Sequence, residues 1–270
     1  MTSAERLPLT GLPPAGTGRR SAALAAWATA YVRGAVGAER VLEAVQREDE
    51  PHRVLGLAAG QDLGSVLADL RARRADGLRL VLPVPGDPRG IPGPGALTAR
   101  ALDAGEAVVT QSGADCYGLV PAVTAHGSDQ EGFTTLVGWE AVPCPPPIPE
   151  PRGTLRQTEH DLADALREAA AELARLDVAS LSAHAADRLA AMRSDARRPL
   201  IALPPSHPVA AQRLLDRAER LAEVLEIAGG DDGAAVDMGS ARARRETLRT
   251  LAAVVRRARV VAVNAPLDLA

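Results

Sequence analysis

The sequence predicts an α/β domain followed by an all-α helical bundle, and three patterns support that fold class. Short apolar runs bounded by Pro and Gly, which are typical of strands, occur through the first half of the chain. Six prolines then crowd residues 143–151, a composition that favours extended polyproline II. Beyond them, apolar residues recur at three- and four-residue spacing, the period of amphipathic helices.

These patterns divide the 270 residues into four parts. Residues 1–20, rich in Pro, Gly and Thr, are expected to form a flexible N-terminal arm. Residues 21–142 form the α/β domain, with a mixed parallel and antiparallel sheet and flanking helices. Residues 143–153 form a Pro-rich linker, and residues 154–270 form an antiparallel helical bundle.

Five elements open the α/β domain, and Ser21 is the expected N-cap of the first helix. Helix, helix, strand, helix and strand are predicted at residues 21–32, 38–47, 53–57, 62–74 and 78–84. The last three form a β-α-β order, which favours parallel pairing of the two strands through a right-handed crossover.

A loop dense in Pro and Gly follows, and then a short helix at residues 96–103. Three further runs with β character are predicted at residues 106–110, 117–124 and 134–142. Their connections have no helical period, so we expect an antiparallel extension of the sheet.

The bundle is predicted to contain four helices, at residues 155–176, 178–192, 209–228 and 240–263. Two glycines at residues 229–230 end the third helix, and Ser240 is the expected N-cap of the fourth.

Composition excludes several chemistries. All 31 basic residues are Arg, so the lysines of phosphate-binding loops, Schiff bases, pyridoxal-phosphate enzymes and protein kinases have no counterpart here. The net charge is −3 and aromatic residues make up 2% of the chain, which argues against attraction to nucleic acid and against base stacking.

Cysteine and histidine patterns predict neither a metal nor a cofactor. Cys116 and Cys144 lie far apart in the sequence and fit neither a zinc motif nor a disulfide framework. The five His residues match no zinc or di-iron motif. No apolar run reaches the roughly 18 residues of a membrane span, and the N-terminus lacks the apolar core of a signal peptide. We therefore expect a cytoplasmic protein.

The loop at residues 83–95 is the first candidate site, because it follows an apolar strand and carries Asp87 and Arg89. Presented at the end of a strand, this pair could hold a small anion or a sugar-like ligand. Alternatively the loop is a rigid turn in which Asp87 bonds nearby backbone N–H groups. Glu106, at the entrance of a later strand, could face Arg89 or be a solvated edge residue.

Charge patterning gives a second candidate. One stripe of the last helix carries Arg242, Arg245, Arg249, Arg256 and Arg259, and the preceding helix carries an acidic stripe of Asp216, Glu219, Glu223 and Glu226. The Arg stripe could bind phosphates or an acidic partner. We favour pairing of the two stripes along the helix seam, because the charge runs match in length.

Three phrases, at residues 82–90, 105–108 and 118–121, resemble a group of hypothetical proteins from high-GC actinobacteria. The abundance of Ala, Arg, Gly and Pro points to the same kind of genome. This resemblance brings no known activity, so it implies no catalytic residue.

The sequence favours a non-enzymatic protein that binds a protein partner or a small ligand. The alternative is an enzyme for a small anionic or polar substrate, with Arg89 as anion clamp and Asp87 or Glu106 as the acid–base group. A third possibility, nucleic-acid binding, requires an unpaired, solvent-facing Arg stripe. An enzyme predicts a pocket where Asp87, Arg89 and Glu106 converge, whereas a binding module predicts exposed apolar surface.

Overall fold

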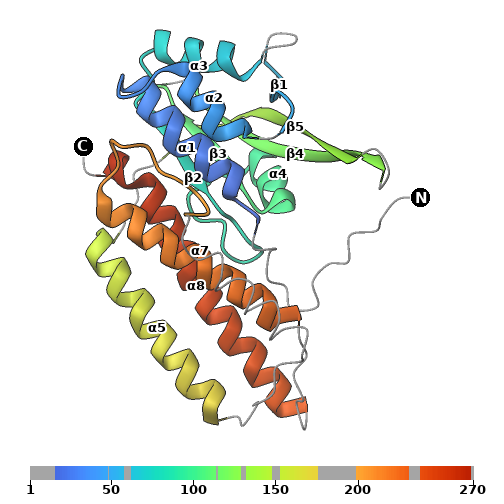
Figure 1. Cartoon of the computed structure of the whole chain (residues 1–270), viewed down its shortest axis with the longest axis vertical. Coiled ribbons are helices and arrows are strands. Elements are labelled where there is room, and N and C mark those ends of the chain that lie inside the picture. The colour runs from blue at the N-terminus through green and yellow to red at the C-terminus, as the bar shows by residue number, and fades with distance from the viewer. Residues whose placement is uncertain are drawn as a thin grey trace. The chain divides into compact units, whose positions relative to one another are not determined.

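A computed structural model describes most of the chain (Figure 1). The described residues are 16–47, 49–57, 62–113, 115–128, 132–147, 153–175, 199–230 and 238–268.

The chain folds as two compact units. The sheet unit comprises the described residues of Thr17–Arg152, together with those of Ile201–Gln212 and Val263–Ala270. The helical unit comprises those of Gly153–Leu200 and Arg213–Ala262. The sheet unit thus includes two segments from beyond the Pro-rich stretch.

Five strands form the sheet, in the order β1-β5-β4-β3-β2. They are β1 (Arg53–Leu55), β2 (Gly77–Val81), β3 (Ala107–Gln111), β4 (Tyr117–Ser128) and β5 (Gly132–Pro143). β1 pairs with β5 in parallel and the other pairs are antiparallel. The predicted mixed sheet and its antiparallel extension are therefore confirmed.

The predicted parallel pairing of the strands at residues 53–57 and 78–84 is wrong, because β1 and β2 lie at opposite edges of the sheet. Strands β2 to β5 instead pair in chain order. Short connections join β3 to β4 and β4 to β5, which favours antiparallel pairing, whereas the connection from β2 to β3 contains α4.

Four helices belong to the N-terminal part of the sheet unit: α1 (Arg19–Val32), α2 (Ala38–Gln46), α3 (Leu63–Ala72) and α4 (Ala96–Ala104). α1 packs against β2, α2 and α3, and α4 packs on β4 and β5. The predicted N-cap role of Ser21 is wrong. α1 begins two residues earlier, after Gly18 in a left-handed conformation, and Ser21 is buried inside it.

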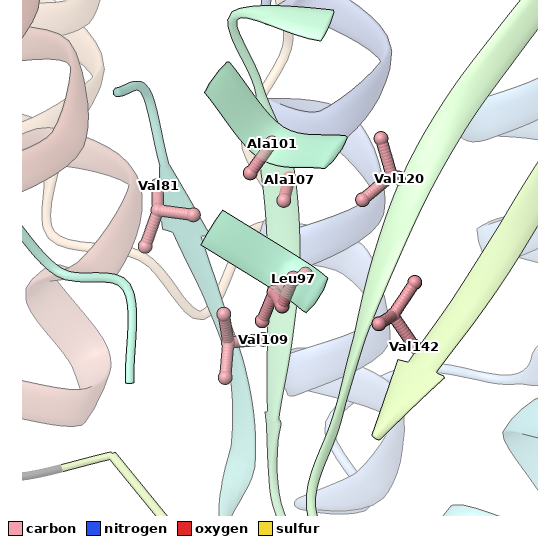
Figure 2. Packing of buried hydrophobic residues seen from close by; sticks show 7 residues of the cluster. All are labelled: Val81, Leu97, Ala101, Ala107, Val109, Val120 and Val142. Atoms are coloured by element: carbon pink, nitrogen blue, oxygen red, sulfur yellow. The ribbon is translucent and has the colours of Figure 1, made fainter. Parts of the chain in front are cut away.

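The face of the sheet under α4 forms a dry core (Figure 2). Leu97 and Ala101 of α4 lie over small and branched side chains from four strands, which are Val81, Ala107, Val109, Val120 and Val142. A Cβ on Gly118 would overlap the side chain of Leu97. Glycine at that position therefore allows α4 to approach the sheet closely.

Side chains from two helices cover the outer edge of β2. Thr29 Oγ1 of α1 accepts a hydrogen bond from Leu78 N at 2.9 Å and donates one to Leu78 O at 3.0 Å. Asn264 Oδ1 accepts from Leu80 N at 2.9 Å, and its Nδ2 donates to Leu80 O at 3.0 Å. These two side chains pair with backbone groups that an exposed edge strand would offer to another chain.

Among the described residues, three long helices lie wholly or mostly in the helical unit, which confirms an all-α C-terminal domain. They are α5 (Leu155–Arg175), α7 (Val209–Gly230) and α8 (Met238–Asp268). Near one end of α8, Arg244 Nη2 donates to Ala228 O at 2.8 Å, whereas further along α8 Arg259 contacts Glu219. These contacts make α7 and α8 antiparallel. The helix predicted at residues 178–192 lies outside the described residues.

α8 differs from its prediction at both ends. It begins before Ser240, which lies inside the helix and so is not its N-cap, a shift typical of helix boundaries. It also continues past Val263 to Asp268, where Asn264 makes its bonds to β2. Among the described residues, no helix combines the length and the apolarity needed to cross a bilayer.

Candidate functional site

Asp87 and Arg89 form an ion pair at the tip of a tight turn. Backbone bonds join Val84 and Asp87 in both directions, and Gly86 adopts φ +85°, which favours glycine. Arg89 Nε and Nη2 donate to the two Asp87 carboxylate oxygens at 2.6 and 2.7 Å. The structure therefore brings these two predicted site residues together, and as a pair their formal charges cancel.

Glu106 has a different neighbour. A hydrogen bond from the guanidinium to Asp49 raises the pKa of Arg20, and the negative charge of Glu106 adds a smaller contribution in the same direction. One carboxylate oxygen of Glu106 is buried without a hydrogen-bond partner among the described residues. Within that part of the chain, no hydrogen bond or ion pair joins Glu106 to Arg89.

A series of polar contacts runs from the half-buried Arg20 to the buried Trp139. Arg20 Nε and Nη2 donate to the Asp49 carboxylate at 2.8 and 2.9 Å. His52 Nε2 lies 3.4 Å from Asp49 Oδ2, and Trp139 Nε1 donates to His52 Nδ1 at 3.2 Å. The indole N–H needs an acceptor, so Nδ1 is unprotonated and the His52 proton is on Nε2.

This series of contacts includes residues that could act as acids or bases, but the geometry indicates a structural role. Burial lowers the pKa of His52, so the imidazole is neutral at pH 7. Both ring nitrogens have partners, and His52 and Trp139 are fully buried. The imidazole therefore has no nitrogen to offer a substrate, and it joins the segment before β1 to β5.

Asp49→Ala is expected to lower the free energy of unfolding by about 1–3 kcal/mol at pH 7, since it removes charge-assisted hydrogen bonds from Arg20. The guanidinium holds the pKa of Asp49 below its usual value. The ionised Asp49 carboxylate therefore makes its full contribution to the free energy of unfolding above about pH 5, and this contribution is lost as the pH falls below 4. Urea titrations of the wild-type chain and the Asp49→Ala variant from pH 3 to 7 measure the difference in their free energies of unfolding.

The matched control is Asp69→Ala, which removes an exposed ion pair with Arg73 and should cost less than about 1 kcal/mol. An Asp49→Ala deficit that stays constant down to pH 3 would contradict this account.

The Arg stripe divides between two environments. Arg259 is buried and its Nε donates to Glu219 Oε1 at 2.5 Å, which confirms pairing between the stripes at that position. Arg249 instead pairs with Glu246 of its own helix at 3.3 Å. Arg242 and Arg245 are exposed, and Arg256 is half-buried.

Both parts of the chain match models of known protein families. Residues 21–153 match the model of the Rv1486c-like protein, N-terminal domain, and residues 156–260 match that of the Rv1486c-like protein, C-terminal domain. The chain belongs to the Rv1486c-like family. The resemblance to an actinobacterial group of hypothetical proteins is thereby confirmed.

Two relatives from Mycobacterium tuberculosis are similar over nearly their whole length. The uncharacterized protein Rv1486c of strain H37Rv is 30% identical over 283 aligned positions, covering 93% of this chain and 98% of the relative. The uncharacterized protein MT1533 of strain CDC 1551 has the same identity and coverage over 285 positions. No solved structure matches this Rv1486c-like chain.

The Rv1486c-like C-terminal domain also has an open groove of about 370 Å³ along α7. It is lined by Arg213, Asp216, Arg217, Arg220, Leu221 and Val224. The sequence pattern predicts an acidic stripe on this helix and does not predict the groove.

Sequence reasoning also missed the Arg20–Asp49–His52–Trp139 chain. Asp49 and His52 are three residues apart, but Trp139 follows 87 residues after His52. No pattern of sequence spacing predicts this contact, because β1 and β5 are neighbours only in the order of strands in the sheet.

Proposed function

We propose that this Rv1486c-like protein is a non-enzymatic cytoplasmic protein that acts by binding protein, and that the β4–β5 ribbon provides the surface. The supporting observation is the placement of exposed apolar side chains. Four large apolar residues are exposed among the described residues, and Leu55, Val123 and Leu136 lie on β1, β4 and β5. The fourth, Val209, is at the start of α7.

Strand register places these side chains on both faces of the ribbon. Leu136 lies opposite Thr124, and Val123 lies opposite Val137, so Val123 and Leu136 point to opposite faces. Leu55 lies opposite Glu140 and so shares the face of Leu136. Leu55 and Leu136 thus expose apolar surface on one face of the sheet, which is typical of an interaction site.

The ribbon also extends beyond its neighbouring strands (Figure 1). β3 pairs with β4 only at Gly118 and Leu119, and β1 pairs with β5 only at residues 138–140. Beyond those positions the two strands pair only with each other among the described strands. A two-stranded ribbon is marginally stable in water unless it packs against something.

The occupant we propose is a second copy of the chain. A two-fold contact between the faces that carry Leu55 and Leu136 would place these side chains of one copy against those of the other. The net charge of −3 opposes self-association weakly. At the rim, Arg100 and Glu140 lie 3.5 Å apart and supply both signs of charge for such a contact.

Sedimentation velocity over about 1–100 µM protein tests this, the range in which modest interfaces associate. The wild-type chain should show concentration-dependent dimerisation. Leu55→Ser with Leu136→Ser should weaken it at least about tenfold, since each change removes apolar area from the contact. Val209→Ser, at an exposed apolar residue elsewhere, should leave it unchanged. A monomeric wild-type chain, or an undiminished dimer of the double variant, would refute the proposal.

Neither alternative function has a specific observation in its favour. The enzyme hypothesis needs Asp87, Arg89 and Glu106 to converge, but Asp87 and Arg89 pair with each other and Glu106 neighbours Arg20. The nucleic-acid hypothesis needs an unpaired stripe, but Arg249 and Arg259 each have an acidic partner.

A further inference from the structure

The two cysteines lie opposite each other in the sheet unit. The antiparallel register pairs Tyr117 with Pro143 and Gly118 with Val142, so the next pair is Cys116 with Cys144. A backbone hydrogen bond from Cys144 N to Cys116 O at 3.0 Å extends the ladder to this pair. Residues directly opposite in an antiparallel pair direct their side chains to the same face. Their spacing in the sequence matches no disulfide framework, so this pairing is seen only in the structure.

The spacing of such a pair suits a disulfide. Directly opposite residues that share backbone hydrogen bonds have Cα atoms about 5.5 Å apart, and disulfides form at Cα separations of about 4.4–6.8 Å. Their Cβ atoms are about 4.5–5.5 Å apart in a ladder, slightly more than a disulfide prefers. The pair lies just beyond the ends of both strands, Tyr117 and Pro143, where the backbone can adjust to close this gap.

The two thiols differ in access. Cys116 is buried, and its Sγ donates to Gly113 O at 3.3 Å. Cys144 is half-buried at the rim of the core under α4. Burial, with a smaller contribution from Cys116, raises the pKa of Cys144 to about 11. Cys144 is therefore the thiol that a reagent meets first, and it reacts slowly at pH 7 because little of it is thiolate.

We propose that Cys116 and Cys144 form a reversible thiol–disulfide site that exchanges with low-molecular-weight disulfides. The Cys144 thiolate attacks the reagent RSSR, which releases one RS⁻ and leaves a mixed disulfide on Cys144. The Cys116 thiolate then attacks Sγ of Cys144 and displaces the second RS⁻. The protein loses two electrons and two protons, the reagent gains them as two RSH, and a Cys116–Cys144 bond remains.

The bond would close a loop that contains the whole β4–β5 ribbon. It would also hold Cys144, at the start of the Pro-rich stretch, next to the start of β4. Closing a loop of this kind restricts the unfolded chain. Oxidation should therefore raise the Tm of the sheet unit by on the order of 5–10 °C, and reduction should reverse the change.

The test incubates the full chain with oxidised and reduced glutathione at pH 8.5, quenches with acid, and measures intact mass after maleimide labelling. The wild-type chain should lose both reactive thiols without a glutathione adduct and stay monomeric under non-reducing denaturing conditions. Cys116→Ser should hold a glutathione adduct on Cys144, because no second thiol can displace it. Cys144→Ser should remain largely unmodified, since Cys116 is buried.

Three results would overturn the proposal. One is a stable glutathione adduct on the wild-type chain, equal to that on Cys116→Ser. Another is retention of both thiols at redox ratios that oxidise the same chain unfolded in urea. The third is a disulfide between two chains. The Tm of the oxidised wild-type chain is a second readout that needs no variant, and a fall in Tm would also contradict the proposed geometry.

Discussion

Replacing Arg259 by Ala is expected to lower the free energy of unfolding of the helical unit by about 3–5 kcal/mol. Arg259 and Glu219 are both buried, at 6% and 1% side-chain exposure, and their charged groups are 2.5 Å apart. Removing the guanidinium takes the positive charge of Arg259 away from a buried carboxylate in the helix seam. Such a charge costs far more than the loss of a surface ion pair.

Urea unfolding followed by circular dichroism measures this effect, and Arg249→Ala is the matched control. Arg249 is on the same helix but pairs with Glu246 at the surface, so its loss should cost less than about 1 kcal/mol. Adding Glu219→Leu to an Arg259→Met variant should recover much of the stability, because neither charge of this pair then remains buried. Equal costs for Arg259→Ala and Arg249→Ala would contradict the buried pairing.

Asn264→Leu is expected to destabilise the sheet unit by about 2–5 kcal/mol, since it leaves two buried backbone groups without hydrogen bonds. The side-chain amide of Asn264 forms hydrogen bonds with both the N–H and the carbonyl of Leu80. Asn264 is 1% exposed. Leu has nearly the same size, so the loss reflects the missing hydrogen bonds. Fluorescence reports this unit alone, because both tryptophans, Trp27 and Trp139, belong to it.

The control for Asn264 is Asp268→Asn, one turn further along α8. Asp268 pairs with Arg79 at 2.7 Å, and the two side chains are 28% and 12% exposed. The amide oxygen of Asn can still accept a hydrogen bond from Arg79, so the change should cost about 1–2 kcal/mol. An Asn264→Leu variant as stable as the Asp268→Asn variant would show that β2 does not depend on the side-chain amide.

Local patterns predicted the elements of the fold well, but not which strands pair. The apolar period placed α5 and α7 within two residues of their observed ends, because each helix buries one continuous stripe. The partner of β1 is β5, which lies more than 80 residues along the chain. Nothing local to β1 specifies that partner, so the β-α-β rule led to the wrong neighbour. Ser21 failed as a cap for a similar reason: packing around α1 outweighed a local preference.

The contacts within the candidate sites were likewise predictable only between residues that lie close together in the sequence. Asp87 and Arg89 share one turn, so sequence reasoning could bring them together. Cys116 and Cys144 meet only once the register of β4 and β5 is known. Glu219 and Arg259 were each placed in the correct stripe, but the sequence did not show which pair would be buried.

Hydrogen–deuterium exchange at low and high protein concentration tests most directly whether the β4–β5 ribbon is a binding surface. At about 100 µM, peptides from residues 121–128 and 132–138 should exchange more slowly than at about 1 µM, whereas those from α5 should not change. Equal exchange of the ribbon at both concentrations, with the wild-type chain monomeric throughout, would contradict the account.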